Sequence, residues 1–108
     1  MEELLLKVGV NPTLDGFRYL AYMAQICEAD HNAHICELYD AAAQHFGVNW
    51  RSVERCCRHA IARMLDTSSF DVIDRVLLQL PDPYKGGYTV GQFVVLLALA
   101  HQREQSPV

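Results

Sequence analysis

The sequence predicts an all-α fold in one domain, and three observations lead to that prediction. Apolar residues recur three and four positions apart between short clusters of breaker residues, which is the spacing of a helix that buries one face. No segment combines strand-like composition with sustained alternation of apolar and polar residues. With 108 residues, 51% of them hydrophobic, the chain has the size and the apolar content of a single domain with its own core.

The breaker residues divide the chain into six expected helices. Breaks fall at residues 9–12, 47, 67–69 and 81–87. The expected helices cover residues 2–8, a stretch from Thr13 or Asp15 to Cys27, and residues 35–46, 50–65, 70–80 and 89–102. Residues 28–34 are expected to form a charged, histidine-rich connection.

The helix ends and the buried faces follow from local chemistry. Gly47 ends the third helix because glycine tolerates the left-handed conformation of a helix C-terminus, and Pro81 stops the fifth. Asn49 is expected to cap the fourth helix, and Thr89, followed by Gln92, to cap the last. The buried stripes expected on the second and fourth helices are Phe17, Leu20, Ala21, Ala24 and Cys27, and Val53, Cys56, Cys57, Ala60, Ile61 and Met64.

Residues 47–49 join the third and fourth helices, and a short glycine-containing turn of this kind is typical of a helix-turn-helix. Ala43 is small where the two helices would cross, and Val53 would pack inward from the fourth helix. Trp50 would either contact a DNA backbone or pack against the third helix. The sequence therefore predicts a helix-turn-helix whose second helix covers residues 50–65.

The polar face of this fourth helix concentrates positive charge on an otherwise acidic chain. Arg51, Arg55 and Arg58 share one stripe at positions i, i+4 and i+7. The other polar residues on or near this stripe are Glu54, His59 and Arg63. Residues 51–63 carry a net charge of +3, whereas the whole chain carries −4, so the remainder carries −7. This pattern favours a DNA-recognition helix, because arginine matches guanine edges and phosphates; the alternative is a solvated face with a ladder of Arg–Glu ion pairs.

Residues 38–61 resemble a known helix-turn-helix. The recognition helix of that family has a Val-Glu-Arg-x-x-Arg-His-Ala-Ile signature, present here as Val53, Glu54, Arg55, Arg58, His59, Ala60 and Ile61. Residues 9–10 and 16–20 are similar to its Gly-Val and Gly-Tyr-x-Tyr-Leu segments, and the last helix fits as well. The family is the C-terminal, DNA-binding effector domain of stage zero sporulation protein A, and the resemblance spans nearly the whole chain.

The resemblance implies a six-helix domain that regulates transcription and binds short promoter boxes in double-stranded DNA as a tandem dimer. Arg55 and Arg58 would read guanines in the groove, and Glu54 would contact a cytosine or support an arginine. The residues expected at the DNA backbone or beside the reading residues are Arg51, Ser52, His59 and Arg63.

The chain also departs from the family's pattern. Ser52 stands where the family usually has a basic residue, and Gln44 and His45 stand where the preceding helix often ends in lysines. Fewer basic residues at the DNA backbone predict weaker binding with a shallower dependence on salt. The family usually carries a receiver domain ahead of the effector, and here we expect a stand-alone effector domain.

The remaining chemistry-bearing residues are expected to be structural. Cys27, His31, His34 and Cys36 lie within ten residues, but their spacing matches no familiar zinc module, so a polar loop is favoured over a zinc-stabilised domain. Residues 56–57, two cysteines, lie on the buried stripe and are favoured as core rather than as a redox pair. No catalytic constellation or phosphate-binding glycine loop stands out, so we expect no enzyme activity, cofactor or metal.

The last helix is apolar on every face from Phe93 to Ala100, which favours a contact with a second chain over complete burial. We therefore expect a homodimer through this helix, either free or only on DNA. The alternative function is a non-catalytic protein-interaction module that dimerises with a related regulator and modulates it. A cytoplasmic location is expected, because the acidic N-terminus does not resemble a signal peptide and no apolar run reaches membrane-spanning length.

Overall fold

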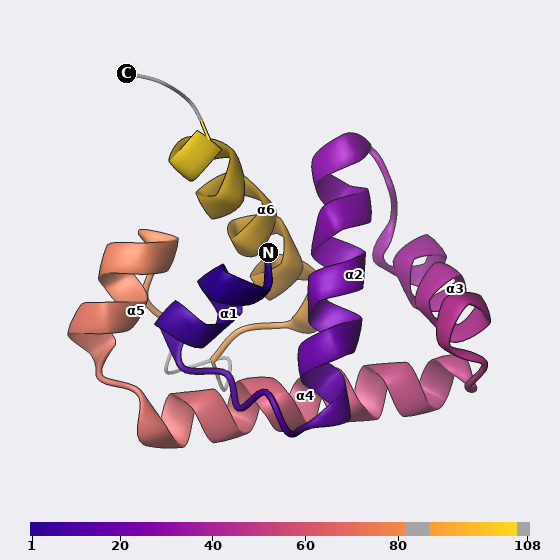
Figure 1. Cartoon of the computed structure of the whole chain (residues 1–108), viewed down its shortest axis with the longest axis horizontal. Coiled ribbons are helices and arrows are strands. Elements are labelled where there is room, and N and C mark those ends of the chain that lie inside the picture. The colour runs from indigo at the N-terminus through magenta and orange to yellow at the C-terminus, as the bar shows by residue number, and fades with distance from the viewer. Residues whose placement is uncertain (82–86, 106–108) are drawn as a thin grey trace.

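The computed structural model describes residues 1–81 and 87–105. These residues form six α-helices (Figure 1), namely α1 (Glu2–Val8), α2 (Asp15–Ala29), α3 (Ile35–Phe46), α4 (Trp50–Thr67), α5 (Phe70–Leu77) and α6 (Val90–Gln105). The predicted all-α fold is confirmed, and α2, α4 and α6 run two or three residues further than expected. None of these described helices combines the length and the apolar character that a membrane crossing requires.

Helix α4 runs along one edge of the molecule, and α1, α2, α5 and α6 lie on one side of it (Figure 1). Helix α2 packs against α3, α4 and α6, and it approaches α4 most closely at Gly16. A Cβ atom at position 16 would overlap the carbonyl oxygen of Cys56 and would lie 2.8 Å from the Cβ of Ala60. The two helices can therefore cross this closely only because position 16 has no side chain.

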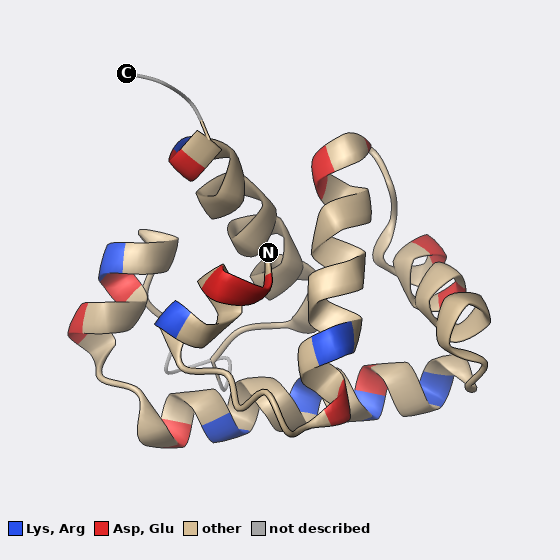
Figure 2. Cartoon of the chain, viewed as in Figure 1, with Lys and Arg blue, Asp and Glu red and all other residues tan. Residues whose placement is uncertain are grey.

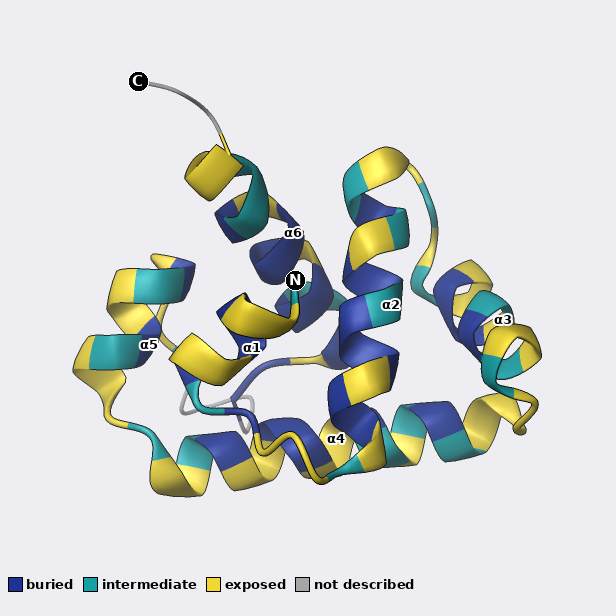
Figure 3. Ribbon diagram, in the orientation of Figure 1, coloured by how far each residue is buried: buried dark blue, intermediate teal, exposed yellow. Residues whose placement is uncertain are grey.

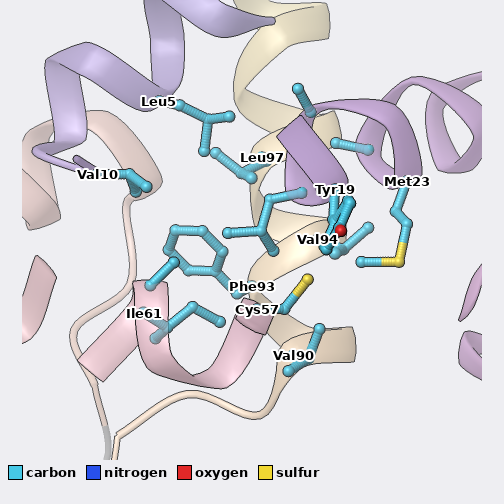
Figure 4. Packing of buried hydrophobic residues seen from close by; sticks show 14 of the residues in the cluster. Leu5, Val10, Tyr19, Met23, Cys57, Ile61, Val90, Phe93, Val94 and Leu97 are labelled. Carbon is cyan, nitrogen blue, oxygen red and sulfur yellow. The ribbon is translucent and has the colours of Figure 1, made fainter. Parts of the chain in front are cut away.

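Helix α6 lies in the core and contacts α1, α2, α4 and α5. Its Phe93, Val94 and Leu97 side chains are completely buried (Figure 4). The all-round apolar character that predicted a second chain is thus largely explained by helices of the same chain. Among the described residues of α6, Val95 and Leu99 are the large hydrophobic side chains that remain exposed, at 46% and 42%.

Helix α5 ends three residues earlier than the sequence predicts, at Leu77. Leu78 adopts the left-handed conformation, with a φ of 58°, and so turns the chain out of the helix before the proline is reached. Beyond the helix, the carbonyl oxygen of Gln79 accepts a hydrogen bond from the hydroxyl of Tyr88. Residues 82–86 of the predicted break lie outside the described residues.

Candidate nucleic-acid interface

The turn between α3 and α4 has the geometry that the sequence predicts. Gly47 lies in the left-handed region, with φ 69° and ψ 37°, and the N–H of Val48 donates to the carbonyl oxygen of Ala43 at 2.9 Å. Asn49 caps α4, because its side-chain oxygen accepts a hydrogen bond from the N–H of Arg51 at 2.8 Å. These local bonds determine where α4 begins.

Helix α4 has one face in the core and the opposite face in solvent (Figure 3). Its buried side chains are Val53, Cys57, Ala60, Ile61 and Met64. The exposed residues predicted to contact DNA are Arg51, Arg55, Arg58, His59 and Arg63, with Ser52 and Glu54 half-buried at the margins. All seven predicted residues therefore lie on the outward half of one helix.

The outward face of α4 contains one ion pair and three arginines outside it. An oxygen of Glu54 accepts a hydrogen bond from the guanidinium of Arg58 at 2.6 Å, one helical turn away. In the part of the chain that the structure describes, Arg51, Arg55 and Arg63 form no ion pair with a carboxylate. Instead of the ladder of ion pairs that the sequence allowed, the structure has a single pair here. The outward face of α4 therefore keeps its excess positive charge (Figure 2).

Trp50 lies where α3 meets α4. Its ring centroid is 6.5 Å from that of Tyr39 on α3, and the guanidinium carbon of Arg51 is 5.5 Å from the centre of the indole. The indole is still 43% exposed, so it packs on α3 along one side and leaves the other in solvent. Burial, followed by the nearby carboxylate of Glu54, raises the pKa of Tyr39 to about 12.

The start of α2 lies beside the outward face of α4, which the sequence did not predict. Asp15, in the first turn of α2, accepts a hydrogen bond from Arg18 at 3.0 Å. The close crossing at Gly16 brings this turn next to α4. The residues that line the open hollow of about 350 Å³ between them are Leu14, Asp15, Arg55, Cys56 and His59. A glycine next to an apolar helical stripe was the one local signal of this proximity.

Helix α3 offers little positive charge to a DNA backbone. Glu37 and Asp40 are exposed, and the basic residue in its last turn is His45. The His45 ring stacks on the ring of Tyr22 from α2, with centroids 4.2 Å apart. Helix α3 therefore adds negative charge and a stacked imidazole beside a positively charged helix.

The cysteines and histidines considered as metal or redox groups are dispersed in the structure. Cys27 is buried and Cys36 is exposed, and within residues 1–81 and 87–105 no three His, Cys, Asp or Glu side chains gather as a metal site would require. Cys57 lies in the core, where burial and, to a smaller extent, the neighbouring Cys56 raise the pKa of its thiol. A buried thiol with a raised pKa is a poor nucleophile, so Cys57 serves packing.

The chain matches a known protein family. The family described as sporulation initiation factor Spo0A C terminal matches residues 1–100, a range that contains the helix-turn-helix and all seven residues predicted to contact DNA. The search of curated proteins finds no match.

Proposed function

Because the chain belongs to the family of Spo0A C-terminal domains, we propose that it binds specific sequences of double-stranded DNA and regulates transcription, with α4 in the major groove. The resemblance based on the signature in α4 is thereby confirmed. The family is a DNA-binding effector domain of a sporulation regulator, which is a regulatory class rather than a catalytic one.

The proposal that α4 enters the major groove rests on one observation, the excess positive charge on its outward face. Within the described residues, Arg51, Arg55 and Arg63 lack a carboxylate partner, although the whole chain has a net charge of −4. The helix has 18 residues, about 27 Å at 1.5 Å per residue, so it can follow the major groove over several base pairs. Long-range repulsion from the acidic remainder would favour approach of DNA along this face alone.

We assign the roles of these residues from their positions on α4. Arg55, in the middle of the outward face, would contact a guanine through two hydrogen bonds, and Arg58 would contact a second guanine. Glu54 would direct Arg58 or accept a hydrogen bond from a cytosine. The residues assigned to the phosphates on either side are Arg51, Ser52, His59 and Arg63.

The decisive experiment measures DNA binding by fluorescence anisotropy, with a duplex enriched from a random library by binding to the wild-type protein. Arg55→Ala is expected to weaken binding to this duplex by about 1–3 kcal/mol and to flatten the preference over random duplex. Arg75→Ala is the matched control, because Arg75 is an exposed arginine of α5 that forms no ion pair among the described residues.

A salt series on the same duplex tests the electrostatic part of the proposal. The log–log slope should correspond to only a few phosphates, each contributing about −0.9, since α3 adds no lysine or arginine. The proposal fails if wild type shows no preference for any duplex, or if Arg55→Ala and Arg75→Ala weaken binding equally.

We also propose that two copies meet on DNA through α6. Val95 and Leu99 support this, because they lie one helical turn apart and are exposed while the rest of the central apolar run is buried. Leu99→Gln should therefore weaken cooperative binding to duplex with two boxes, whereas Leu6→Gln, an exposed leucine of α1, should leave it unchanged. Light scattering gives the stoichiometry, and a strict monomer both free and on DNA would contradict the dimer.

A further inference from the structure

A second basic site lies away from α4, in an open pocket of about 520 Å³ between α1, α5 and α6. Three cationic residues line it, Lys7 from α1, Arg75 from α5 and Arg103 from α6. The other residues that line the pocket are Val72, Val76, Ala100 and Glu104. The pocket thus combines a cationic rim with apolar walls.

The positive charge outside α4 is concentrated at this pocket. In the described chain the lysines and arginines outside α4 are Lys7, Arg18, Arg75 and Arg103, and every one except Arg18 lines the pocket. The three residues come from distant parts of the sequence, and Figure 2 shows the corresponding basic segments on α1, α5 and the end of α6. Folding alone brings them together.

The three cations are not fully neutralised by their neighbours. Lys7 forms an exposed ion pair with Glu104 at 3.0 Å, and the guanidinium of Arg103 donates to the carbonyl oxygen of Val76 at 3.0 Å. For Arg75 no hydrogen bond or ion pair is formed with any described residue. Three positive charges against one carboxylate leave the pocket with a formal charge of +2.

Favourable interaction with helix ends explains part of this arrangement. Lys7, Arg75 and Arg103 each lie in the last turn of their helix, where a cation is stabilised by the partial negative charge of the terminal carbonyl groups. That effect acts on each helix separately and does not require three helices to direct their cations into one hollow. Ala100 and Val76 also pack in the core, so the apolar walls are partly a consequence of the fold.

We propose that this pocket binds a small organic anion, in which a carboxylate or phosphate group is joined to a short apolar part. Arg75 and Arg103 can hold such a group through charge-assisted hydrogen bonds, with Lys7 as a third positive charge. Val72 and Val76, which are both half-buried, offer the apolar part a surface away from water. The volume lies in the range of small-molecule sites, and because the pocket is open we expect modest affinity. No residue that lines the pocket belongs to α4.

An NMR titration of the full chain, without DNA and at constant ionic strength, tests the proposal. Phenyl phosphate and benzoate are the two anionic probes, and benzyl alcohol is the uncharged counterpart. At least one anion should produce saturable shifts at the backbone amides around the pocket, and the comparison of the two anions identifies which acidic group the site prefers. Benzyl alcohol should produce none.

Two variants assign the binding to the pocket. Arg75→Gln is expected to weaken the anion about tenfold, since one charge-assisted contact is lost. It should fold normally, because Arg75 contacts no described residue through hydrogen bonds or ion pairs. Arg18→Gln removes the same charge outside the pocket and should leave the affinity unchanged. The proposal is overturned if neither anion gives saturable shifts, or if the two variants weaken binding equally.

Discussion

The contact between Glu54 and Arg58 favours one orientation of a guanidinium of α4 in the free protein. An exposed pair of this kind contributes only about 0.3–0.5 kcal/mol to stability, so its main effect is expected on binding. A side chain that is already oriented loses less conformational entropy when it contacts a base. The carboxylate also repels phosphates, which disfavours wrong registers on the duplex.

Removal of this carboxylate should therefore change selectivity more than stability. Glu54→Gln is expected to raise the affinity for random duplex and to reduce the preference for the enriched duplex about tenfold. Fluorescence anisotropy on both duplexes measures the effect, and Glu3→Gln, an exposed glutamate of α1, controls for net charge. The effects of Glu54→Gln and Arg58→Ala should not add, since the two residues act as one unit. Additive effects would show that Arg58 is not positioned by Glu54.

At this scale the sequence predicts which side chains face outward but not what lies next to them. Helical periodicity places Arg51, Arg55 and Arg63 opposite the buried stripe of α4, and the structure agrees. The position of Asp15 beside α4 depends on how closely two helices cross. Likewise, the pocket that contains Lys7 depends on packing between residues far apart in the sequence. The pocket has no local pattern, and the one local signal of the close crossing is Gly16 beside an apolar stripe.

The crossing of α2 and α4 links the helix-turn-helix to the core, and it depends on one missing side chain. At Gly16 a methyl group would overlap backbone atoms of Cys56, which cannot move without displacing α4. At Gly47, by contrast, a Cβ atom would meet nothing within 4 Å, although the positive φ disfavours any other residue. The two glycines are therefore required for different reasons.

Alanine substitutions should separate these two reasons. Gly16→Ala is expected to lower the free energy of unfolding by about 3 kcal/mol because two helices must move apart. Gly47→Ala should cost only about 1 kcal/mol, the penalty for a side chain in the left-handed region. Urea unfolding followed by circular dichroism gives both values. If the two variants lost equal stability, the close crossing at Gly16 would not limit the packing of α2 on α4.

Element boundaries could be predicted where they are set by local bonds and not where they depend on distant residues. The Asn49 cap and the Thr89 cap, which accepts a hydrogen bond from the N–H of Gln92 at 3.1 Å, are confirmed because each involves neighbours in the chain. The end of α5 was predicted too late, because Leu78 already leaves the helix in the left-handed conformation, which nothing in the neighbouring sequence indicates. The burial of α6 was also underestimated, because sequence alone does not show how many helices surround it.

Two buried tyrosines make the stability of the whole molecule sensitive to alkaline pH. Burial raises the pKa of Tyr39 to about 12, with a smaller effect of Glu54, and burial together with Asp74 raises that of Tyr88 to about 12. In the unfolded chain both phenols titrate near the ordinary value of 10.0. Between pH 10 and 12 the unfolded chain therefore binds fewer protons than the folded one, and stability falls as pH rises.

The expected loss is about 2 kcal/mol for each tyrosine across this range, present in full above the folded-state pKa. Urea midpoints measured at a series of pH values should show this decline. Tyr39→Phe removes one of the titrating groups and should make the decline shallower. A midpoint that stays constant between neutral pH and pH 12, or an unchanged slope in Tyr39→Phe, would contradict the argument.

Among the described residues, positive charge gathers mainly in two places, the outward face of α4 and the pocket between α1, α5 and α6, and Arg18 of α2 lies outside both. The division of the chain into a segment with a net charge of +3 and a remainder with −7 is visible in the sequence, because the four arginines of α4 all lie within residues 51–63. The second basic site is not visible there, because its three cations each stand alone among neutral or acidic neighbours.

The separation of the two faces of α4 has an evolutionary consequence. Core packing constrains Val53, Cys57 and Ala60, whereas the fold places no such demand on the side chains at positions 51, 55 and 63. Substitutions at those three positions can therefore accumulate without loss of the folded state. A duplicated copy of this chain could acquire a new DNA target through a few surface changes, while its architecture remained the same.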